Sequence, residues 1–223
     1  MEWSSQTVLV TGANRGIGLE LCRQLQALGA DVVAVCRNAS EPLSELGVRV
    51  IENIDVSDDA SLQQLATALG SQQIDCLVNN AGVLDSDSLE DFDTESIEWQ
   101  FRINALGPLR LTRAVLSNLG PGARVGIVTS RMGSIGDNTS GGYYGYRMSK
   151  AAVNMAGVSL AHDLRERGVS VALLHPGMVA TDMTGGNGVP VAKAAQGLID
   201  RLAGLNPDNS GSFWHAEGYG LPW

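Results

Sequence analysis

The sequence predicts an α/β fold with a doubly wound, mostly parallel sheet of about seven strands flanked by helices. Short apolar runs alternate with longer amphipathic stretches along the chain, and the connections between them are short. Apolar runs of this kind, bounded by turn residues, are typical of strands buried on both faces of a sheet. Because a helix separates successive strands, the alternation favours parallel pairing.

The elements are expected in strict alternation. Leu21, Leu25 and Leu28 keep helical spacing, and Gly29 follows them as a C-cap residue. The connection 38–47 contains Pro42, so only a turn or two of helix is expected there. The expected strands are 7–11, 31–36, 48–54, 75–80, 124–130 and 170–175, with one more around 212–216. The expected helices are 17–28, 58–69, 94–118, 144–167 and 190–204.

The composition is that of a globular chain, and one domain is expected over residues 1–223. Hydrophobic residues make up 44% of the chain and charged residues 17%, values that argue against disorder. The formal net charge is −9, which argues against nucleic acid and anionic membrane as partners because both require a basic face. Neither is therefore expected as a partner.

The cysteines and the N-terminal segment indicate a cytoplasmic protein. Cys22, Cys36 and Cys76 are odd in number, far apart and placed in apolar runs, as expected of reduced thiols. No apolar run approaches the roughly 18 residues needed to span a membrane. The segment MEWSSQTVLV lacks the layout of a signal peptide. A cytoplasmic location is therefore expected.

Two other kinds of site lack support in the sequence. His162, His175 and His215 lie far apart without a ligand-like spacing, so no metal site is expected. There is also no G-x-S-x-G elbow of the kind that carries a serine hydrolase nucleophile.

The first expected strand runs directly into the glycine-rich stretch TGANRGIG at 11–18. Gly12, Gly16 and Gly18 form a G-x-x-x-G-x-G pattern at a strand-to-helix turn. In such a turn one glycine allows the tight bend, another lets backbone approach a pyrophosphate, and a third lets the helix pack closely. The N-terminus of the following helix then faces the phosphates, so the sequence predicts a dinucleotide site.

The residues after the next two strands indicate which dinucleotide is bound. Arg37 stands near the end of the second strand, where an NAD-preferring site places an acidic residue, and Arg15 lies in the glycine turn. Two guanidinium groups suit a 2′-phosphate, so NADP(H) is predicted over NAD(H). Asp55 closes the third strand, where it can accept from the adenine amino group or serve only as a polar strand end.

Three of the four tyrosines lie in YYGYRMSK at 143–150, which ends on one of the two lysines. In a helix, Tyr146 and Lys150 share a face, whereas Tyr143 and Tyr144 have no lysine at that spacing. A neighbouring ammonium stabilises a phenolate and is expected to lower the tyrosine pKa toward working pH. Tyr146 is therefore the candidate proton donor to a developing alkoxide.

Six landmarks follow one another along the chain: TGANRGIG (11–18), NNAG (79–82), Asn104 in FRINALG, Ser130 in IVTSRMGS, YRMSK (146–150) and HPGMVATDM (175–183). Their order is typical of the classical short-chain dehydrogenases/reductases, and the chain resembles that family. The likeness is greatest to the carbonyl-reductase and C-factor-like members. The resemblance implies a single-domain Rossmann fold, NADP(H) as cofactor and reversible reduction of a ketone or aldehyde carbonyl in a small-molecule substrate.

The resemblance also implies catalytic roles. Tyr146 would be the general acid in reduction and the base in oxidation. Lys150 would hold the nicotinamide ribose and depress the tyrosine pKa. Ser130 would polarise the substrate carbonyl, and Asn104 would hold a water between Lys150 and solvent. The spacing from Ser130 to Tyr146 is a little longer than the family's commonest spacing, which leaves Ser134 as a rival serine.

A cofactor site along the carboxyl ends of the strands is implied in the same way. Asn80, Ala81 and Gly82 would line the adenosine and ribose side. The turn after the sixth strand would cradle the nicotinamide carboxamide through Pro176, Gly177, Val179 and Thr181. The remaining expected cofactor contacts are Gly12, Asn14, Arg15, Gly16, Ile17, Gly18, Arg37, Asp55, Val56, Tyr146 and Lys150.

Substrate, assembly and biological role are less constrained. The segment 183–190 is short and glycine-rich, as expected of a mobile lid. An apolar wall formed by Met178, Met183, Tyr143 and Tyr144 would favour medium or bulky ketones. A homodimer or homotetramer is expected through the helices 94–118 and 144–167. The alternative function is an NADP(H)-binding signalling or sensor protein of the C-factor type with incidental catalysis.

Overall fold

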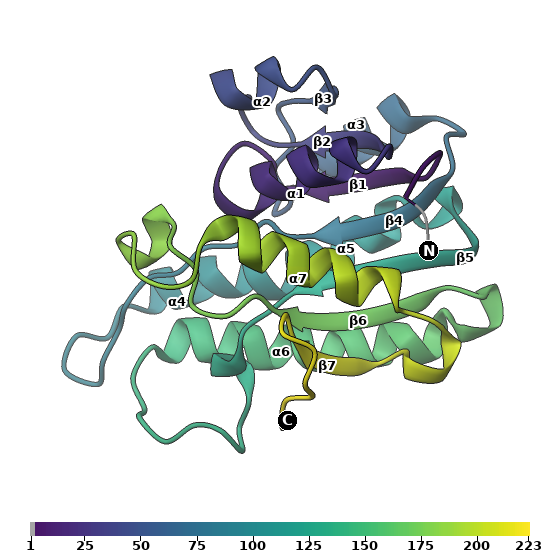
Figure 1. Cartoon of the computed structure of the whole chain (residues 1–223). Coiled ribbons are helices and arrows are strands. Elements are labelled where there is room, and N and C mark those ends of the chain that lie inside the picture. Colours follow the sequence, from purple (N-terminus) through teal and green to yellow (C-terminus); the bar gives the residue numbers. More distant parts are fainter. Residues whose placement is uncertain (1–2) are drawn as a thin grey trace.

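The computed structural model, which describes residues 3–223, contains a seven-stranded parallel sheet within those residues (Figure 1). Its strands are β1 (Thr7–Thr11), β2 (Asp31–Val35), β3 (Arg49–Ile51), β4 (Ile74–Asn79), β5 (Leu119–Val128), β6 (Ser170–His175) and β7 (Ser212–His215). Their spatial order is β3-β2-β1-β4-β5-β6-β7. The chain therefore winds outward from β1 to one edge and then from β4 to the other, which confirms the predicted doubly wound fold.

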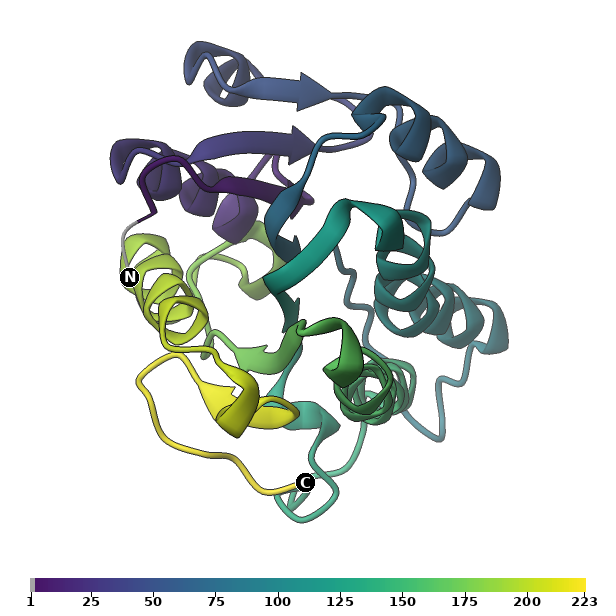
Figure 2. The same ribbon diagram turned by 90° about the vertical axis from the view of Figure 1, so that its right-hand side faces the viewer.

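The strands carry side chains alternately to two apolar layers, because successive residues of a strand face opposite sides. Val8 and Val10 pack with α1 (Gly16–Ala27) and α7 (Val191–Ala203), whereas Leu9 packs with the helices of the other face. Figure 2 shows α1 and α7 on one side of the sheet and the remaining long helices on the other. Those helices are α3 (Asp59–Leu69), α4 (Thr94–Phe101), α5 (Gly107–Ala114) and α6 (Tyr144–Asp163).

Most expected elements lie where the sequence placed them. The connection after β2 contains the five-residue helix α2 (Glu41–Glu45), as its proline-limited length predicted. Strand β3 is shorter than expected, because Asn53 adopts a left-handed conformation with φ 62° and turns the chain. Strand β5 starts at Leu119 instead of 124, since Leu119 pairs with Ile74 of β4 across a register shift.

The expected helix 94–118 is the main error of the prediction. Between α4 and α5 the chain forms a π-helical segment at Arg102–Leu106, and a 3₁₀ turn at Leu116–Asn118 follows α5. In a π turn each hydrogen bond spans five residues instead of the four of an α-helix. The side chains that follow the turn therefore point in a different direction than a continuous α-helix would give them. Hydrophobic periodicity does not reveal such a turn, yet it is where Asn104 lies.

Candidate active site

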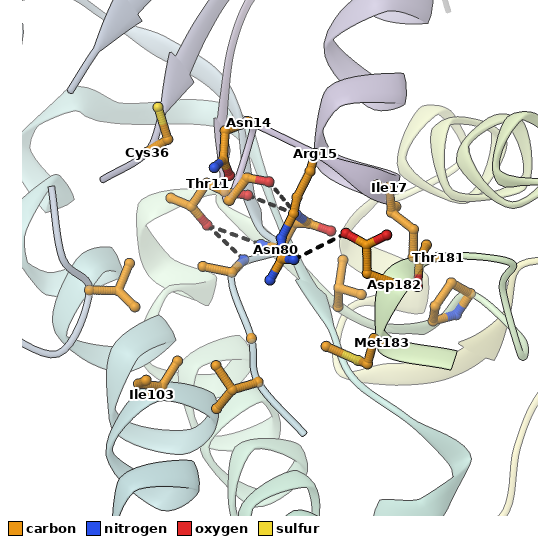
Figure 3. A pocket seen from close by; sticks show the side chains of 18 of the residues that line it. Thr11, Asn14, Arg15, Ile17, Cys36, Asn80, Ile103, Thr181, Asp182 and Met183 are labelled. Carbon is orange, nitrogen blue, oxygen red and sulfur yellow. Dashed lines mark hydrogen bonds and ion pairs between the residues drawn. The ribbon is translucent and has the colours of Figure 1, made fainter. Parts of the chain in front are cut away.

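A cavity of about 650 Å³ opens at the carboxyl ends of the strands, where the winding direction reverses between β1 and β4. In doubly wound sheets this switch point is the usual ligand site. Many of the residues predicted for the cofactor line it (Figure 3). They are Gly12, Asn14, Arg15, Gly16, Ile17, Arg37, Asp55, Val56, Asn80, Ala81, Gly82, Tyr146, Lys150, Pro176 and Thr181.

Each of the three glycines in the first turn occupies a position that a residue with a side chain would fill poorly. Gly12 and Gly16 adopt left-handed φ values of 63° and 54°, which a residue with a Cβ atom rarely takes. A Cβ at Gly18 would lie 2.2 Å from the Gly12 carbonyl oxygen, so this residue allows α1 to pack against the turn. Gly18 is therefore a packing residue beneath the cavity, whereas Gly12 and Gly16 line it.

Thr11 and Asn80 join the ends of β1 and β4 beneath the cavity. The Thr11 hydroxyl accepts from the backbone N–H groups of Asn80 and Ala81 at 3.1 and 3.2 Å. The Asn80 side chain donates to the carbonyls of Thr11 and Gly12 at 2.8 and 3.3 Å. Figure 3 shows this cluster at the base of the glycine turn. It fixes the NNAG segment against that turn, which gives Asn80 a structural role the motif alone does not show.

Four charged side chains line the part of the cavity that we call its outer end: Arg15, Arg37, Asp55 and Asp182. The Arg15 guanidinium forms an ion pair with Asp182 at 3.2 Å, joining the glycine turn to the loop after β6 (Figure 3). Both side chains are exposed, by 69% and 83%. Burial acts to raise the pKa of Asp55, but hydrogen bonds from the Ser57 hydroxyl and N–H and the Arg37 charge together hold it below its ordinary value.

The first turns of α6 bring Tyr146 and Lys150 to the cavity wall, and the part of the cavity that these two residues line is called its inner end. The Lys150 Nζ lies 5.6 Å from the centre of the Tyr146 ring and donates to the Val128 carbonyl at 3.1 Å. Both residues are buried, with 9% and 5% of their surfaces exposed. Ser130, two residues beyond the end of β5, forms a hydrogen bond with the Tyr146 side chain.

The pKa of Tyr146 differs from the sequence expectation. Burial raises the Tyr146 pKa to about 12, although the hydrogen bond with Ser130 acts to lower it. Burial also lowers the pKa of Lys150 to about 8. The sequence predicted that Lys150 would lower the pKa of the phenol, and this prediction is wrong. The free energy lost by removing the phenolate from water exceeds the stabilisation that the hydrogen bond with Ser130 provides, so the pKa rises.

Asn104 lies in the π turn directly opposite Gly82. Its side chain accepts from the N–H of Val83 and donates to the Val83 carbonyl, both at 2.8 Å, and donates to Ser149 of α6 at 3.0 Å. A Cβ at Gly82 would lie 3.2 Å from Asn104 Oδ1 and 3.6 Å from Lys150 Nζ. Asn104 and Lys150 therefore face one small space, although Asn104 is not among the cavity-lining residues.

The matched family model is described as short chain dehydrogenase and covers residues 6–189. The chain belongs to the short chain dehydrogenase family. A 1-hydroxy-2-glutathionyl-2-methyl-3-butene dehydrogenase of Rhodococcus sp. (strain AD45) is 46% identical over 97% of this chain and 99% of its own length. C-signal of Myxococcus xanthus is 47% identical over 73% of this chain and 100% of its own length.

Solved structures of the short chain dehydrogenase type agree with the fold and with the cofactor prediction. An NADPH-bound carbonyl reductase from chicken fatty liver superposes with a TM-score of 0.91 at 30% identity, covering 99% of this chain and 100% of that one. The predicted family and enzyme class, an oxidoreductase, are thereby confirmed.

The two candidate serines have different surroundings. Ser130 Oγ accepts from the Met132 N–H at 3.1 Å and contacts Tyr146 as described. Ser134 Oγ donates to the Trp223 carbonyl at 3.1 Å and accepts from the Asp137 N–H at 3.1 Å. Ser134 is thus engaged in fixing the loop after β5 to residue 223.

Only two of the four residues predicted in the turn after β6 line the cavity. Pro176 and Thr181 line the cavity, but Gly177 and Val179 do not. Gly177 has φ 89° and packs beside His215, while Val179 is buried and bridges to Val189. Gly177 and Val179 therefore set the backbone conformation of the turn and do not face the cavity themselves.

Several cavity residues of this dehydrogenase were not identified from the sequence. Of the expected apolar wall, Met183 lines the cavity, but Met178, Tyr143 and Tyr144 are not among its lining residues. Asp182 follows the predicted Thr181 directly, and Thr11 opens the glycine motif, so adjacency to a motif is the signal that could have found both. The other unpredicted lining residues include Cys36, Ile103 and Thr129.

Residues 3–223 show neither a metal-ligand cluster nor a membrane-spanning helix. Within them, no group of three or more His, Cys, Asp or Glu side chains is arranged to hold a metal ion. No helix in the same range is long and apolar enough to cross a membrane.

Proposed function

We propose that the chain is a single-domain, NADPH-dependent carbonyl reductase that converts a ketone or aldehyde to an alcohol, reversibly. The observation that carries this proposal is the juxtaposition of Ser130, Tyr146 and Lys150. Tyr146 and Lys150 line the dinucleotide cavity, and Ser130, which is not among the lining residues, forms a hydrogen bond with the Tyr146 side chain. This group offers a proton donor, a second hydroxyl and a cation beside one another. A dinucleotide-binding protein without chemistry has no need of such a group.

The residues present suit a dinucleotide phosphate. Gly12 and Gly16 leave backbone unobstructed at the N-terminus of α1, where a pyrophosphate would lie. Arg15 and Arg37 line the outer end, where they would hold the 2′-phosphate. Pro176 and Thr181 would contact the nicotinamide end. When bound, NADPH supplies the hydride for reduction.

The chain's own residues supply the proton and the polar field. Because burial raises its pKa to about 12, the Tyr146 phenol stays protonated at neutral pH and is ready to donate from its Oη to the substrate oxygen. The Ser130 hydroxyl would donate to the same oxygen and stabilise its developing negative charge. Lys150 would hold the cofactor ribose and would help to return a proton to Tyr146 after each turnover. Asn104 would keep a water beside Lys150.

The decisive test removes one oxygen atom. Tyr146→Phe should lower turnover by at least about two orders of magnitude, because general acid catalysis contributes that much. NADPH binding, measured by quenching of protein fluorescence, should remain close to that of the wild type. Turnover near the wild-type rate in this variant would contradict the mechanism.

The substrate screen should include both reaction directions. Ketones, aldehydes and diketones are tested with NADPH, as the chicken-liver carbonyl reductase suggests. Because the Rhodococcus relative is named for a 1-hydroxy-2-glutathionyl compound, glutathionylated alcohols are tested with NADP⁺. The exposed Met183 side chain on the cavity favours medium or bulky apolar groups on the substrate.

The similarity to C-signal supports one alternative, a signalling or sensor protein that binds NADP(H) with incidental catalysis. The two functions differ in the screen just described. Tight NADPH binding without turnover on any carbonyl or alcohol would favour the sensor, whereas efficient turnover would favour the reductase.

We propose a homodimer or homotetramer in the cytoplasm as the working form. Leu109 of α5 and Met148 and Met155 of α6 are exposed and offer apolar area for such contact, while Leu160 of α6 is buried in the core. Light scattering of the wild type and of Met155→Glu would test this assembly, and a monomeric wild type would contradict it.

A further inference from the structure

The helix that carries Tyr146 and Lys150 is held at its N-terminus by one residue of the loop after β4. The Asp87 carbonyl accepts from the Tyr143 N–H at 3.0 Å. Its carboxylate accepts from the next two backbone donors, the Tyr144 N–H and, at 2.8 Å, the Gly145 N–H. Three successive N–H groups at the start of α6 are thus bound by a residue 56 to 58 positions away, counting from 87 to 143–145.

The backbone that enters α6 needs such an anchor. Gly141, Gly142 and Tyr143 have successive left-handed φ values of 64°, 63° and 52°. Tyr143 carries a Cβ atom in this conformation, which persists in proteins only where the surroundings impose it. The hydrogen bonds to Asp87 are the surroundings that impose it here, because they fix the N–H of Tyr143 itself and the two N–H groups that follow it.

The loop after β4, which contains Asp87, also forms hydrogen bonds with Asn104 in the π turn. Val83 forms two hydrogen bonds with Asn104, and the Asp85 N–H donates to the Gln100 side chain at 3.1 Å. The segment 83–87 therefore contacts the π turn at one end and the first turn of α6 at the other. Its length and conformation set the distance between Asn104 and the Tyr146 helix.

Close packing leaves this arrangement little freedom. A Cβ at Gly145 would lie 3.1 Å from Asp87 Oδ2, 2.7 Å from the Gln100 amide nitrogen and 3.1 Å from the Ile97 Cα. Gly145 therefore lets the carboxylate and α4 approach the backbone directly. Because Tyr146 is the third residue of α6, a shift of this first turn would move its phenol away from Ser130.

We propose that Asp87 is a positioning residue for the reaction, and that it acts by fixing the first turn of α6 so that Tyr146 and Ser130 share one substrate oxygen. The proposal rests on the reductase function given above. Asp87 is not among the residues that line the cavity, so we assign it no contact with substrate or cofactor. Its removal should therefore lower kcat and leave cofactor affinity unchanged.

The test compares two aspartates with the same local task. Asp58 caps α3, the helix that follows the edge strand β3, by accepting from the N–H groups of Ala60 and Ser61 at 3.3 and 3.0 Å. Asp87→Ala and Asp58→Ala each remove an N-terminal cap and should lower Tm by a similar amount. Only Asp87→Ala should also lower kcat, by about 10- to 100-fold, since small misplacements of catalytic groups have effects of that size. The NADPH Kd should remain within about twofold of the wild type in both variants.

Two more variants complete the design. Asp87→Asn keeps one acceptor oxygen of the right shape and should recover part of the lost kcat. Gly145→Ala keeps Asp87 but forces it away, so kcat should fall although alanine is the better helix former. If Asp87→Ala does not fold, these two variants carry the test.

Equal kcat for Asp87→Ala and Asp58→Ala would overturn the proposal, as would a wild-type kcat in Gly145→Ala. Either result would leave the reductase function standing, provided the wild type turns over a carbonyl substrate. A wild type without turnover on the screen would instead count against the proposed function itself.

Discussion

The two ends of the cavity are built in different ways. At the outer end, the shape of the glycine turn comes from backbone conformations within one short stretch, Gly12 to Gly18, and the contacts from Asn80 hold a turn that is already defined locally. At the inner end, Tyr146 is positioned through side chains that reach across the chain, such as Asn104 to Ser149 and Asp87 to Gly145. The first end is thus specified locally, whereas the second depends on how distant segments pack. Substitutions should separate these two modes.

The largest effect is expected at the inner end. Lys150→Met should lower turnover by at least about 100-fold, because the variant loses the cation beside the phenol and the ribose. It should nevertheless be more stable than the wild type at pH 7, since burial opposes the charged lysine, whose pKa is lowered to about 8.

The pH dependence of this stability difference has a definite sign. Between pH 8 and the ordinary lysine pKa of 10.5, the unfolded wild type holds a proton that the folded wild type has released. The wild type therefore gains stability through this site as pH rises across that window. The Tm advantage of Lys150→Met should shrink from pH 8 to 10.5, and an advantage that grows there would contradict the assigned burial of the ammonium.

At the outer end, the strongest local test is Gly18→Ala. The added Cβ would lie 2.2 Å from the Gly12 oxygen, so the turn or α1 must shift. The free energy of unfolding in urea should fall by about 3 kcal/mol, as overpacking against rigid backbone does.

Gly204→Ala is the matched control for that change. Gly204 has φ −86° at the C-terminal end of α7, and the atom nearest to an added Cβ would be the carbonyl oxygen of Asp200 in that helix, at 3.6 Å. Its stability should stay within about 0.5 kcal/mol of the wild type. A similar loss in both variants would mean that Gly18 is not a special packing position.

A smaller effect is expected from the charge that selects the cofactor. Arg37→Ala should weaken NADPH binding by about 10- to 100-fold, the worth of a hydrogen bond to a charged group, and should leave NADH binding nearly unchanged. Titration calorimetry with both cofactors gives this comparison. Tighter binding of NADH than NADPH by the wild type would reject the cofactor assignment.

The smallest effect concerns the exposed ion pair at the mouth of the cavity. Asp182 competes with a 2′-phosphate for Arg15, so Asp182→Asn should tighten NADPH binding. Exposed pairs contribute at most about 1 kcal/mol, so the gain should be about two- to fivefold at low salt and should fade as salt is added. A gain that persists at high salt would indicate a different cause.

The same division between local and long-range construction explains what the sequence could predict. Gly12, Arg37 and the pairing of Tyr146 with Lys150 follow from spacing within one element, and the structure brings these residues to one cavity. The π turn at Arg102–Leu106 and the anchoring by Asp87 depend on tertiary contacts, which leave no periodic pattern. The direction of the Tyr146 pKa was missed for a related reason, since burial of a phenol is a property of the packed structure.

The pairing of β1 with β4 has a consequence for how the chain acquires its cavity. Val8 pairs with Cys76, so the inner edge of β1 stays open until residues 76–78 have been synthesised and have docked. Parallel sheets lack hairpins that could form this contact early, and contacts so distant in sequence form slowly. During synthesis, β1, α1 and β2 therefore present an unpaired apolar strand edge that chaperones or aggregation partners can reach. That docking event forms the β1–β4 side of the crevice, which later residues such as Tyr146 and Thr181 complete. A cofactor that binds in the completed crevice would make the docking harder to reverse.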